Sequence, residues 1–185
     1  MVEPAAVTWL DDFAADPSSA AAWVVFTDRV MGGVSTAAAT MEPVAGRRAL
    51  HLRGTVSLER NGGFVQVARP LGRDGAPLDA RGFSGLVFHV CGTPGPYFVH
   101  LRTAQTRAPW QHYRAPLPVE PQWTTVTVPW SAFTPQGLAT PLDVSVLTRL
   151  GVVGGQAAFE AAVAVERVGF ITNTVRIQSR SCCSS

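Results

Sequence analysis

Lysine is missing from this 185-residue chain, and all 15 of its basic residues are arginine. Charged residues make up only 15% of the chain, and the formal net charge is +2. The arginines are scattered, so no basic run could follow a phosphate backbone, and we expect no nucleic-acid partner. No apolar run approaches the about 18–20 residues that a membrane-spanning helix requires, so we expect no membrane span.

Cysteine is scarce, with three residues in the chain. Cys91 stands in an apolar run and is expected to be a small buried residue. Cys182 and Cys183 are adjacent near the C-terminus and poorly placed to pair with each other. A disulfide framework is therefore not expected, which fits a reducing compartment. The N-terminus has no arginine before Arg29 and resembles neither a secretory signal nor a transit peptide, so we expect a cytoplasmic protein.

Catalytic signatures are also lacking. The four histidines lie singly, there is no His-Glu-x-x-His or Cys-x-x-Cys motif, and no loop is acidic enough to predict calcium, so no metal or cofactor is expected. Residues 82–85 superficially resemble a nucleophile elbow, but the glycine spacing is wrong. Asp28 and Glu59 are the one pair of carboxylates that we consider for glycosidase-like chemistry. No constellation supports an enzyme, and we expect none.

Alternating apolar and polar residues predict an all-β protein after residue 45. The expected strands, about eight, fall within 49–56, 64–68, 86–90, 97–103, 113–119, 124–130, 147–153 and 159–171. Clusters of Pro and Gly separate them, and only a short helical turn at 16–22 and a brief turn at 130–133 are expected besides. We expect a single domain over 1–185, with a β-sandwich or barrel core at about 8–171 and a C-terminal tail at 172–185.

Two loops carry a matched pattern of charge, two glycines and flanking apolar residues. The first reads DRVMGGVS at 28–35 and the second SLERNGGF at 57–64. Glycine pairs permit positive φ and close backbone approach. We therefore predict that the two loops meet at one edge of the sandwich. Their candidate binding residues are Asp28, Arg29, Met31, Ser35, Glu59 and Asn61. The alternatives are that Met31 fills a gap in the core and that Asn61 belongs to a simple hairpin turn.

With these two loops the chain resembles the complex I intermediate-associated protein 30 family. Segments 97–103, 110–113, 122–133 and 149–152 resemble later parts of the family pattern, so the resemblance runs from about Trp9 to Ile171. It implies a galactose-binding-like jelly-roll sandwich and a protein-binding role, because the family is named for a factor that helps assemble respiratory complex I. The chain departs from the mitochondrial form in having no targeting extension, and Arg29 and Arg60 add positive charge beside the loops.

The strand at 97–103 suggests where a ligand would lie. Alternation places Phe98, His100 and Arg102 on one face and the residues between them on the core face. A groove with Arg102, Trp110, Gln111 and Tyr113 would suit a sugar or a peptide backbone, because guanidinium forks bind polar groups and aromatic rings stack. The alternative is that Arg102 pairs with a loop carboxylate, Asp28 or Glu59, and only braces the loops.

These observations predict a jelly-roll sandwich that binds rather than catalyses. The first functional hypothesis is a protein-binding accessory or assembly factor that uses the two-loop edge and the adjacent sheet face. The second is a module that binds carbohydrate or another small polar ligand. The fold alone does not separate them, because function depends on the site and not on the scaffold.

Overall fold

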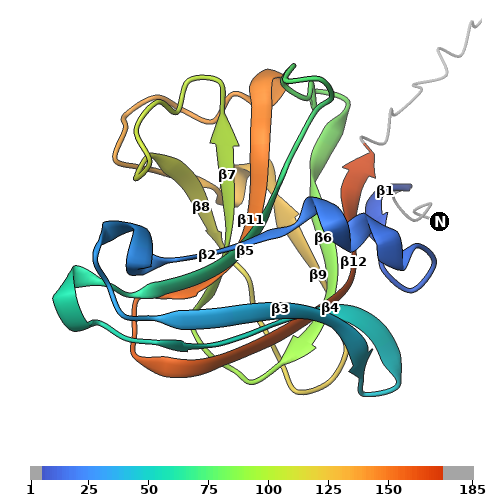
Figure 1. Ribbon diagram of the computed structural model, residues 1–185. Helices are drawn as coiled ribbons and strands as arrows, with labels where there is room; N and C mark the ends of the chain where they lie inside the picture. Colours follow the sequence, from blue (N-terminus) through green and yellow to red (C-terminus); the bar gives the residue numbers. More distant parts are fainter. Residues whose placement is uncertain (1–5, 173–185) are drawn as a thin grey trace, which may run out of the picture.

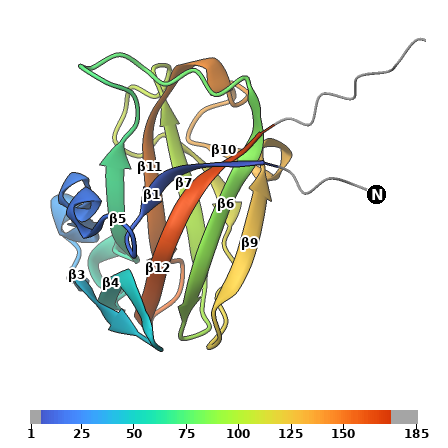
Figure 2. The ribbon, with the colours of Figure 1, turned by 90° about the vertical axis from the view of Figure 1, so that its right-hand side faces the viewer.

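Two antiparallel sheets packed face to face form the protein (Figures 1 and 2). The computed structural model describes residues 6–172. The first sheet has the order β3 (Thr36–Val44), β4 (Arg47–Val56), β12 (Phe159–Thr172), β6 (Phe83–Gly92) and β9 (Thr124–Pro129), and β1 (Val7–Asp12) also pairs with β12. The second has the order β10 (Thr134–Gln136), β8 (His112–Pro116), β7 (Tyr97–Thr103), β11 (Leu147–Gly155), β5 (Phe64–Pro70) and β2 (Val24–Thr27). This confirms the predicted all-β jelly-roll sandwich.

Alternating side chains build the core between the sheets. In β7 the residues Tyr97, Val99 and Leu101 are almost fully buried, whereas those between them are only partly covered. The predicted core face of this strand is therefore confirmed. Cys91 is buried as well, also as predicted. The internal strands β11 and β12 carry long runs of buried residues.

Short 3-10 helices link several strands: η1 (Pro17–Ala22), η2 (Asp28–Met31), η3 (Glu59–Asn61), η4 (Trp130–Ala132) and η5 (Val144–Val146). The predicted turns at 16–22 and 130–133 correspond to η1 and η4. Asp16 caps η1 by accepting a hydrogen bond from the Ser18 amide at 3.1 Å. The sequence did not predict β1, β2, β3 or β10. These strands carry weak patterns, because β2 and β10 are very short and β3 consists largely of Ala and Thr.

A buried ion pair joins the two sheets near the N-terminus. Arg69 on β5 donates to both carboxylate oxygens of Asp11 on β1 at 2.7 Å, and the Trp23 indole donates to the same carboxylate at 3.0 Å. Asp11 is 4% exposed. The buried carboxylate therefore has two donors, Arg69 on β5 and Trp23 just before β2. Both donors belong to the second sheet or the segment leading into it, so they tie β1 to the facing sheet.

Candidate functional site

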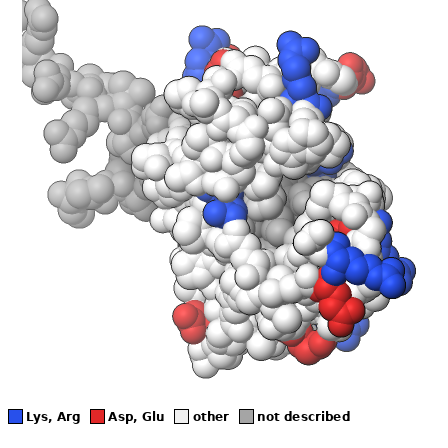
Figure 3. Space-filling view, turned by 90° about the vertical axis from the view of Figure 1, so that its left-hand side faces the viewer, with Lys and Arg blue, Asp and Glu red and all other residues white. Residues whose placement is uncertain are grey.

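A groove of about 750 Å³ crosses the outer face of the second sheet. Figure 3 looks onto this side of the molecule and shows the hollow, with few acidic atoms close to it. Residues from β5, β7, β8 and β11 form its floor, and residues of η2 and the segment 109–110 stand at its sides. Its aromatic and basic lining consists of Phe26, Phe64, Phe98, Trp110, His100, His112, Arg102, Arg114 and Arg149.

Strand register explains why these side chains meet. Phe98 of β7 lies opposite Val153 of β11, which lies opposite Gln66 of β5, and Gln66 lies opposite Phe26 of β2. Residues opposite each other in adjacent strands project from the same face. Two residues further along β7, His100 lies opposite Gly151, whose missing side chain leaves space for the Gln66 side chain. The order and register of the strands therefore determine most of the lining, and the loops contribute less.

Three arginines occupy the groove without a carboxylate partner among residues 6–172. Arg114 lies over the Phe98 ring at 5.0 Å, and Arg149 lies over the Phe26 ring at 5.2 Å. Arg102 donates to the carbonyl oxygens of Thr106 and Ala108 at 3.4 and 3.0 Å. The alternative that Arg102 pairs with a loop carboxylate is therefore wrong.

Two stacked histidines lie beside these arginines. The rings of His100 and His112 are 3.9 Å apart at an interplanar angle of 20°. Burial, together with the neighbouring His112 and Arg114, lowers the pKa of His100 to about 2. Burial and the nearby arginines also lower the pKa of His112. The hydrogen bond from its Nδ1 to the Trp110 carbonyl, at 3.0 Å, raises the pKa but does not outweigh them. Both rings are therefore neutral at pH 7 and add no further charge to the groove.

The carboxylate of Asp28 joins the two glycine loops at one end of the groove. It accepts hydrogen bonds from the Ser35 amide at 3.0 Å, the Ser35 hydroxyl at 2.5 Å and the Gly63 amide at 2.6 Å. The Phe64 amide adds a longer bond of 3.4 Å. In Figure 1 the two loops lie side by side, as these bonds require. The prediction that the loops meet at one edge is confirmed.

Glycine is required where the two loops approach this carboxylate. A β-carbon at Gly62 would lie 2.5 Å from Oδ2 of Asp28, and one at Gly33 would clash with Oδ1. Asp28 itself is 0% exposed. Burial raises its pKa, but the Ser35 hydroxyl and the amides of Gly63, Ser35 and Phe64 together hold the pKa below its usual value. Asp28 is therefore an ionised structural anchor and cannot reach a substrate as a glycosidase carboxylate would.

The other predicted loop residues have different positions. Ser35 is buried and also accepts from the Ser57 amide at 2.9 Å, so it supports the loops. Arg29, Glu59 and Asn61 are exposed near the groove but do not line it. Met31 does line it and is 57% exposed. The alternative that Met31 fills a gap in the core is therefore wrong.

The residues predicted around 102–113 also separate into two groups. Arg102 and Trp110 line the groove, and Trp110 is 65% exposed. Gln111 instead accepts from the amides of Arg107 and Ala108, so it holds the loop that Arg102 contacts. Tyr113 was predicted to bind, but its ring is fully buried in the core and cannot contact a ligand in the groove. Alternation along β8 turns Tyr113 inward and its neighbours outward.

Several groove residues were not predicted as site residues: Phe26, Phe64, Phe98, His100, His112, Arg114 and Arg149. Alternation places Phe98 and His100 beside Arg102 on one face, a signal that could have identified them. No local pattern brings Phe26 or Arg149 to this surface, because their positions depend on which strands become neighbours.

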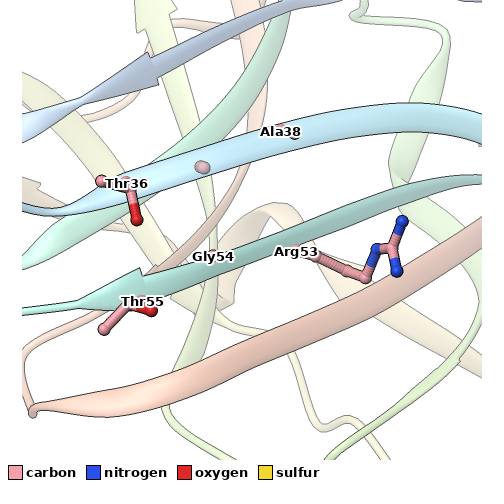
Figure 4. A pocket seen from close by; sticks show the side chains of 6 residues that line it. Thr36, Ala38, Arg53, Gly54 and Thr55 are labelled. Atoms are coloured by element: carbon pink, nitrogen blue, oxygen red, sulfur yellow. The ribbon is translucent and has the colours of Figure 1, made fainter.

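A second, smaller depression of about 440 Å³ lies over β3 and β4 of the first sheet. Figure 4 shows its Thr36, Ala38, Gly54 and Thr55 along the two strands, with Arg53 extending to one side. Arg53 lies 3.4 Å from the Glu42 carboxylate, so its charge is already compensated. Small side chains and a compensated charge make this the weaker candidate site.

Metal and membrane sites were searched over the described part of the chain. No group of three or more His, Cys, Asp or Glu residues within 6–172 could hold a metal ion. Nor does any helix in this region have the length and apolar character to cross a membrane. The adjacent Cys182 and Cys183 lie outside the described residues.

The pattern of the complex I intermediate-associated protein 30 family matches residues 12–156. The chain belongs to this family. The matched span contains both glycine loops and the Asp28 carboxylate that joins them. No curated protein sequence matches the chain significantly.

Solved structures similar to this family member include carbohydrate-binding modules and agarases. The family 11 carbohydrate-binding module of the cellulosomal cellulase Lic26A-Cel5E of Clostridium thermocellum has a TM-score of 0.70 and 14% identity, over 92% of this chain and 97% of that one. A family 30 carbohydrate-binding module has a TM-score of 0.55 and 16% identity, over 76% and 92%. The agarase AgWH50C has a TM-score of 0.58 and 10% identity, over 91% of this chain and 26% of that one. At these identities the likeness shows the shared jelly-roll fold alone.

Valine at Gly63 or Gly32 is expected to destabilise the fold by about 1–3 kcal/mol, because both glycines have positive φ, 137° and 87°. The loss at Gly63 should be larger, since an added β-carbon would also lie 3.0 Å from the Leu58 side chain. Thermal unfolding of Gly82→Val is the control, because that glycine has an open position and no positive φ. Equal melting temperatures in all three variants would show that the positive φ angles at Gly32 and Gly63 do not require glycine.

Proposed function

We propose that the chain is a non-catalytic binding domain whose groove on the second sheet takes a segment of a partner protein. The composition of the groove is the observation that carries this proposal. Its lining includes phenylalanine, tryptophan, methionine and arginine, and no Asp or Glu. The cores of protein interfaces are enriched in the same residue types and depleted in the absent ones. Binding hot spots favour tryptophan and arginine in particular.

Exposed apolar side chains at the groove support a protein partner further. Val30 and Met31 of η2 are 75% and 57% exposed, and Trp110 stands at the groove with 65% exposed. Contact with sugar hydroxyl groups would give the exposed Val30 and Met31 side chains little binding free energy, whereas contact with apolar peptide side chains would remove them from water. Membership of a family named for a complex I intermediate suggests an accessory or assembly role for such binding.

Photo-crosslinking from two positions tests this function. A photoreactive phenylalanine at position 30 in the groove is expected to form discrete protein adducts in extract of the native cell. The same group at Thr127, exposed on the first sheet, is the matched control. Trp110→Ala should remove the adducts from position 30, whereas Val24→Ala, which truncates an exposed apolar residue outside the groove, should keep them. Adducts that are identical from both positions, or unaffected by Trp110→Ala, would contradict the proposal.

Carbohydrate binding is the second candidate function. The exposed Trp110 ring and the amide side chains of Gln66 and Gln156 lie in the same groove, and aromatic faces with polar groups are what sugar binding uses. One similar module is described in complex with a β-1,3-1,4-mixed-linked tetrasaccharide, with a TM-score of 0.69 and 13% identity, over 92% of this chain and 98% of that one. Calorimetric titration with that tetrasaccharide separates the candidates, because Trp110→Ala would weaken only specific binding in the groove.

A further inference from the structure

Three arginines that pair with no carboxylate in the part of the chain that the structure describes gather in the groove. Four arginines elsewhere in residues 6–172 pair with carboxylates, among them Arg69 with Asp11 at 2.7 Å and Arg47 with Glu166 at 3.0 Å. The three groove arginines have no such partner, and the lining contains no acidic residue. The groove therefore concentrates positive charge that nothing in the described chain neutralises.

The sheet also sets two of these charges directly against each other. Arg102 of β7 and Arg149 of β11 are cross-strand partners. Like charges in opposite positions destabilise a sheet. Burial and this neighbour lower the pKa of the Arg102 guanidinium, which reports the same repulsion. An anion bound between the two would relieve the repulsion and so gain binding energy from it.

Neutral acceptors hold the arginines in position without cancelling their charge. Arg102 donates to two carbonyl oxygens, and Arg114 lies over the Phe98 ring. Guanidinium groups fixed in this way lose less side-chain entropy when they form forked hydrogen bonds to a carboxylate. The stacked neutral histidines beside them leave the pattern of charge unchanged over the physiological pH range.

The exposed apolar side chains at the groove favour one class of anionic ligand over others. A single small anion would leave Val30, Met31 and Trp110 exposed at the groove. An acidic sugar would offer hydroxyl groups to the aliphatic Val30 and Met31. A peptide with both carboxylate and apolar side chains matches both kinds of lining.

We infer that the segment bound in the groove is acidic, with Asp or Glu side chains that pair with Arg102, Arg114 and Arg149. Apolar side chains of the same segment contact the exposed tips beside the groove. This inference rests on the proposed protein-binding function and specifies the chemistry of the partner.

Selection of random 12-residue peptides displayed on phage tests the inference. Peptides selected on the wild type are expected to be enriched in Asp and Glu. One such peptide should bind at least tenfold more weakly when its acidic residues become Asn and Gln, since a hydrogen bond to a charged group contributes about 1.5–3 kcal/mol. The protein variant Arg114→Gln/Arg149→Gln should lose at least tenfold as well, and it leaves the Arg102 contacts to the loop intact.

A charge-matched variant is the control. Arg48→Gln/Arg73→Gln removes two exposed positive charges outside the groove and should retain the affinity within about twofold, because screened distant charges contribute little. An equal loss in both double variants would overturn the inference, since only net charge would then matter.

The remaining outcomes distinguish the two proposals. Neutral peptides whose binding needs Trp110 but not the arginines would overturn the acidic segment and leave a protein-binding groove. Selection of no peptide, together with binding of the mixed-linked tetrasaccharide or of oligogalacturonate, would overturn both.

Discussion

Asp28→Ala is expected to lower the free energy of unfolding by about 3 kcal/mol, which corresponds to a fall of about 6–12 °C in melting temperature. The substitution removes the acceptor of four hydrogen bonds from Ser35, Gly63 and Phe64. Donors left unpaired inside a protein cost the full loss of their hydration. Since Asp28 joins the two glycine loops together with Ser35, the end of the groove should open as well.

Thermal unfolding of Glu59→Ala is the matched control, because it removes an exposed carboxylate from the neighbouring loop. Its melting temperature should stay close to that of the wild type. A similar small change in Asp28→Ala would mean that the buried carboxylate does not anchor the loops.

The dependence on pH follows from the lowered pKa of Asp28. Its folded-state pKa lies below the unfolded value of about 3.9, so the stabilisation is complete above that pH and is lost as the pH falls through the folded pKa. The difference in stability between wild type and Asp28→Asn should therefore shrink below about pH 4. A difference that stayed constant there would exclude an ionised carboxylate as the source.

Asp11→Ala is expected to destabilise the protein by about 3–5 kcal/mol, because it leaves the partly buried Arg69 guanidinium and the Trp23 indole without their acceptor. The pair joins β1 of the first sheet to β5 of the second, so its loss should also expose the amides of β1 to hydrogen exchange. Denaturant unfolding with an unchanged slope would report the loss directly.

The exposed pair of Asp79 and Arg81 offers a comparison of the same chemistry at the surface. Asp79→Ala should leave the unfolding midpoint nearly unchanged, because water and salt screen an exposed pair. Equal losses in Asp11→Ala and Asp79→Ala would show that burial does not set the cost.

Local periodicity predicted the strand faces, and paired motifs predicted the loop contact. Alternation along 97–103 correctly separated the buried Tyr97, Val99 and Leu101 from the residues that face the groove. The repeated Gly-Gly motifs correctly predicted that the two loops meet, although the sequence did not show that one buried carboxylate would join them. These features depend on neighbours in sequence or on matched composition, which a sequence displays directly.

Side-chain partners across strands were not predictable in this way. Asp28 and Glu59 were considered as ion-pair partners of Arg102. The strand order instead places Arg102 opposite Arg149, and its guanidinium donates to a nearby loop. Met31 was a candidate binding residue with a place in the core as the alternative, and only the position of η2 shows that it faces outward. The composition of the groove follows from the order β8-β7-β11-β5-β2, and no single segment carries that information.

The sheet order and the Asp28 contact together shape the groove. The sheet order gathers aromatic and arginine side chains on one face, and Asp28 holds the two loops beside it. A loss of the anchor should therefore weaken binding indirectly, through the position of Val30 and Met31, whereas a loss of the arginines should weaken it directly.

The most direct test of the binding groove is chemical-shift mapping of the isotope-labelled protein with the partner segment recovered by crosslinking. The account predicts that the largest shifts fall on amides of 98–102, 149–155 and 64–66, which border the groove. It also predicts that Trp110→Ala abolishes them at the same peptide concentration. Shifts concentrated on β3 and β4 around the smaller depression, or shifts that persist unchanged in Trp110→Ala, would contradict it.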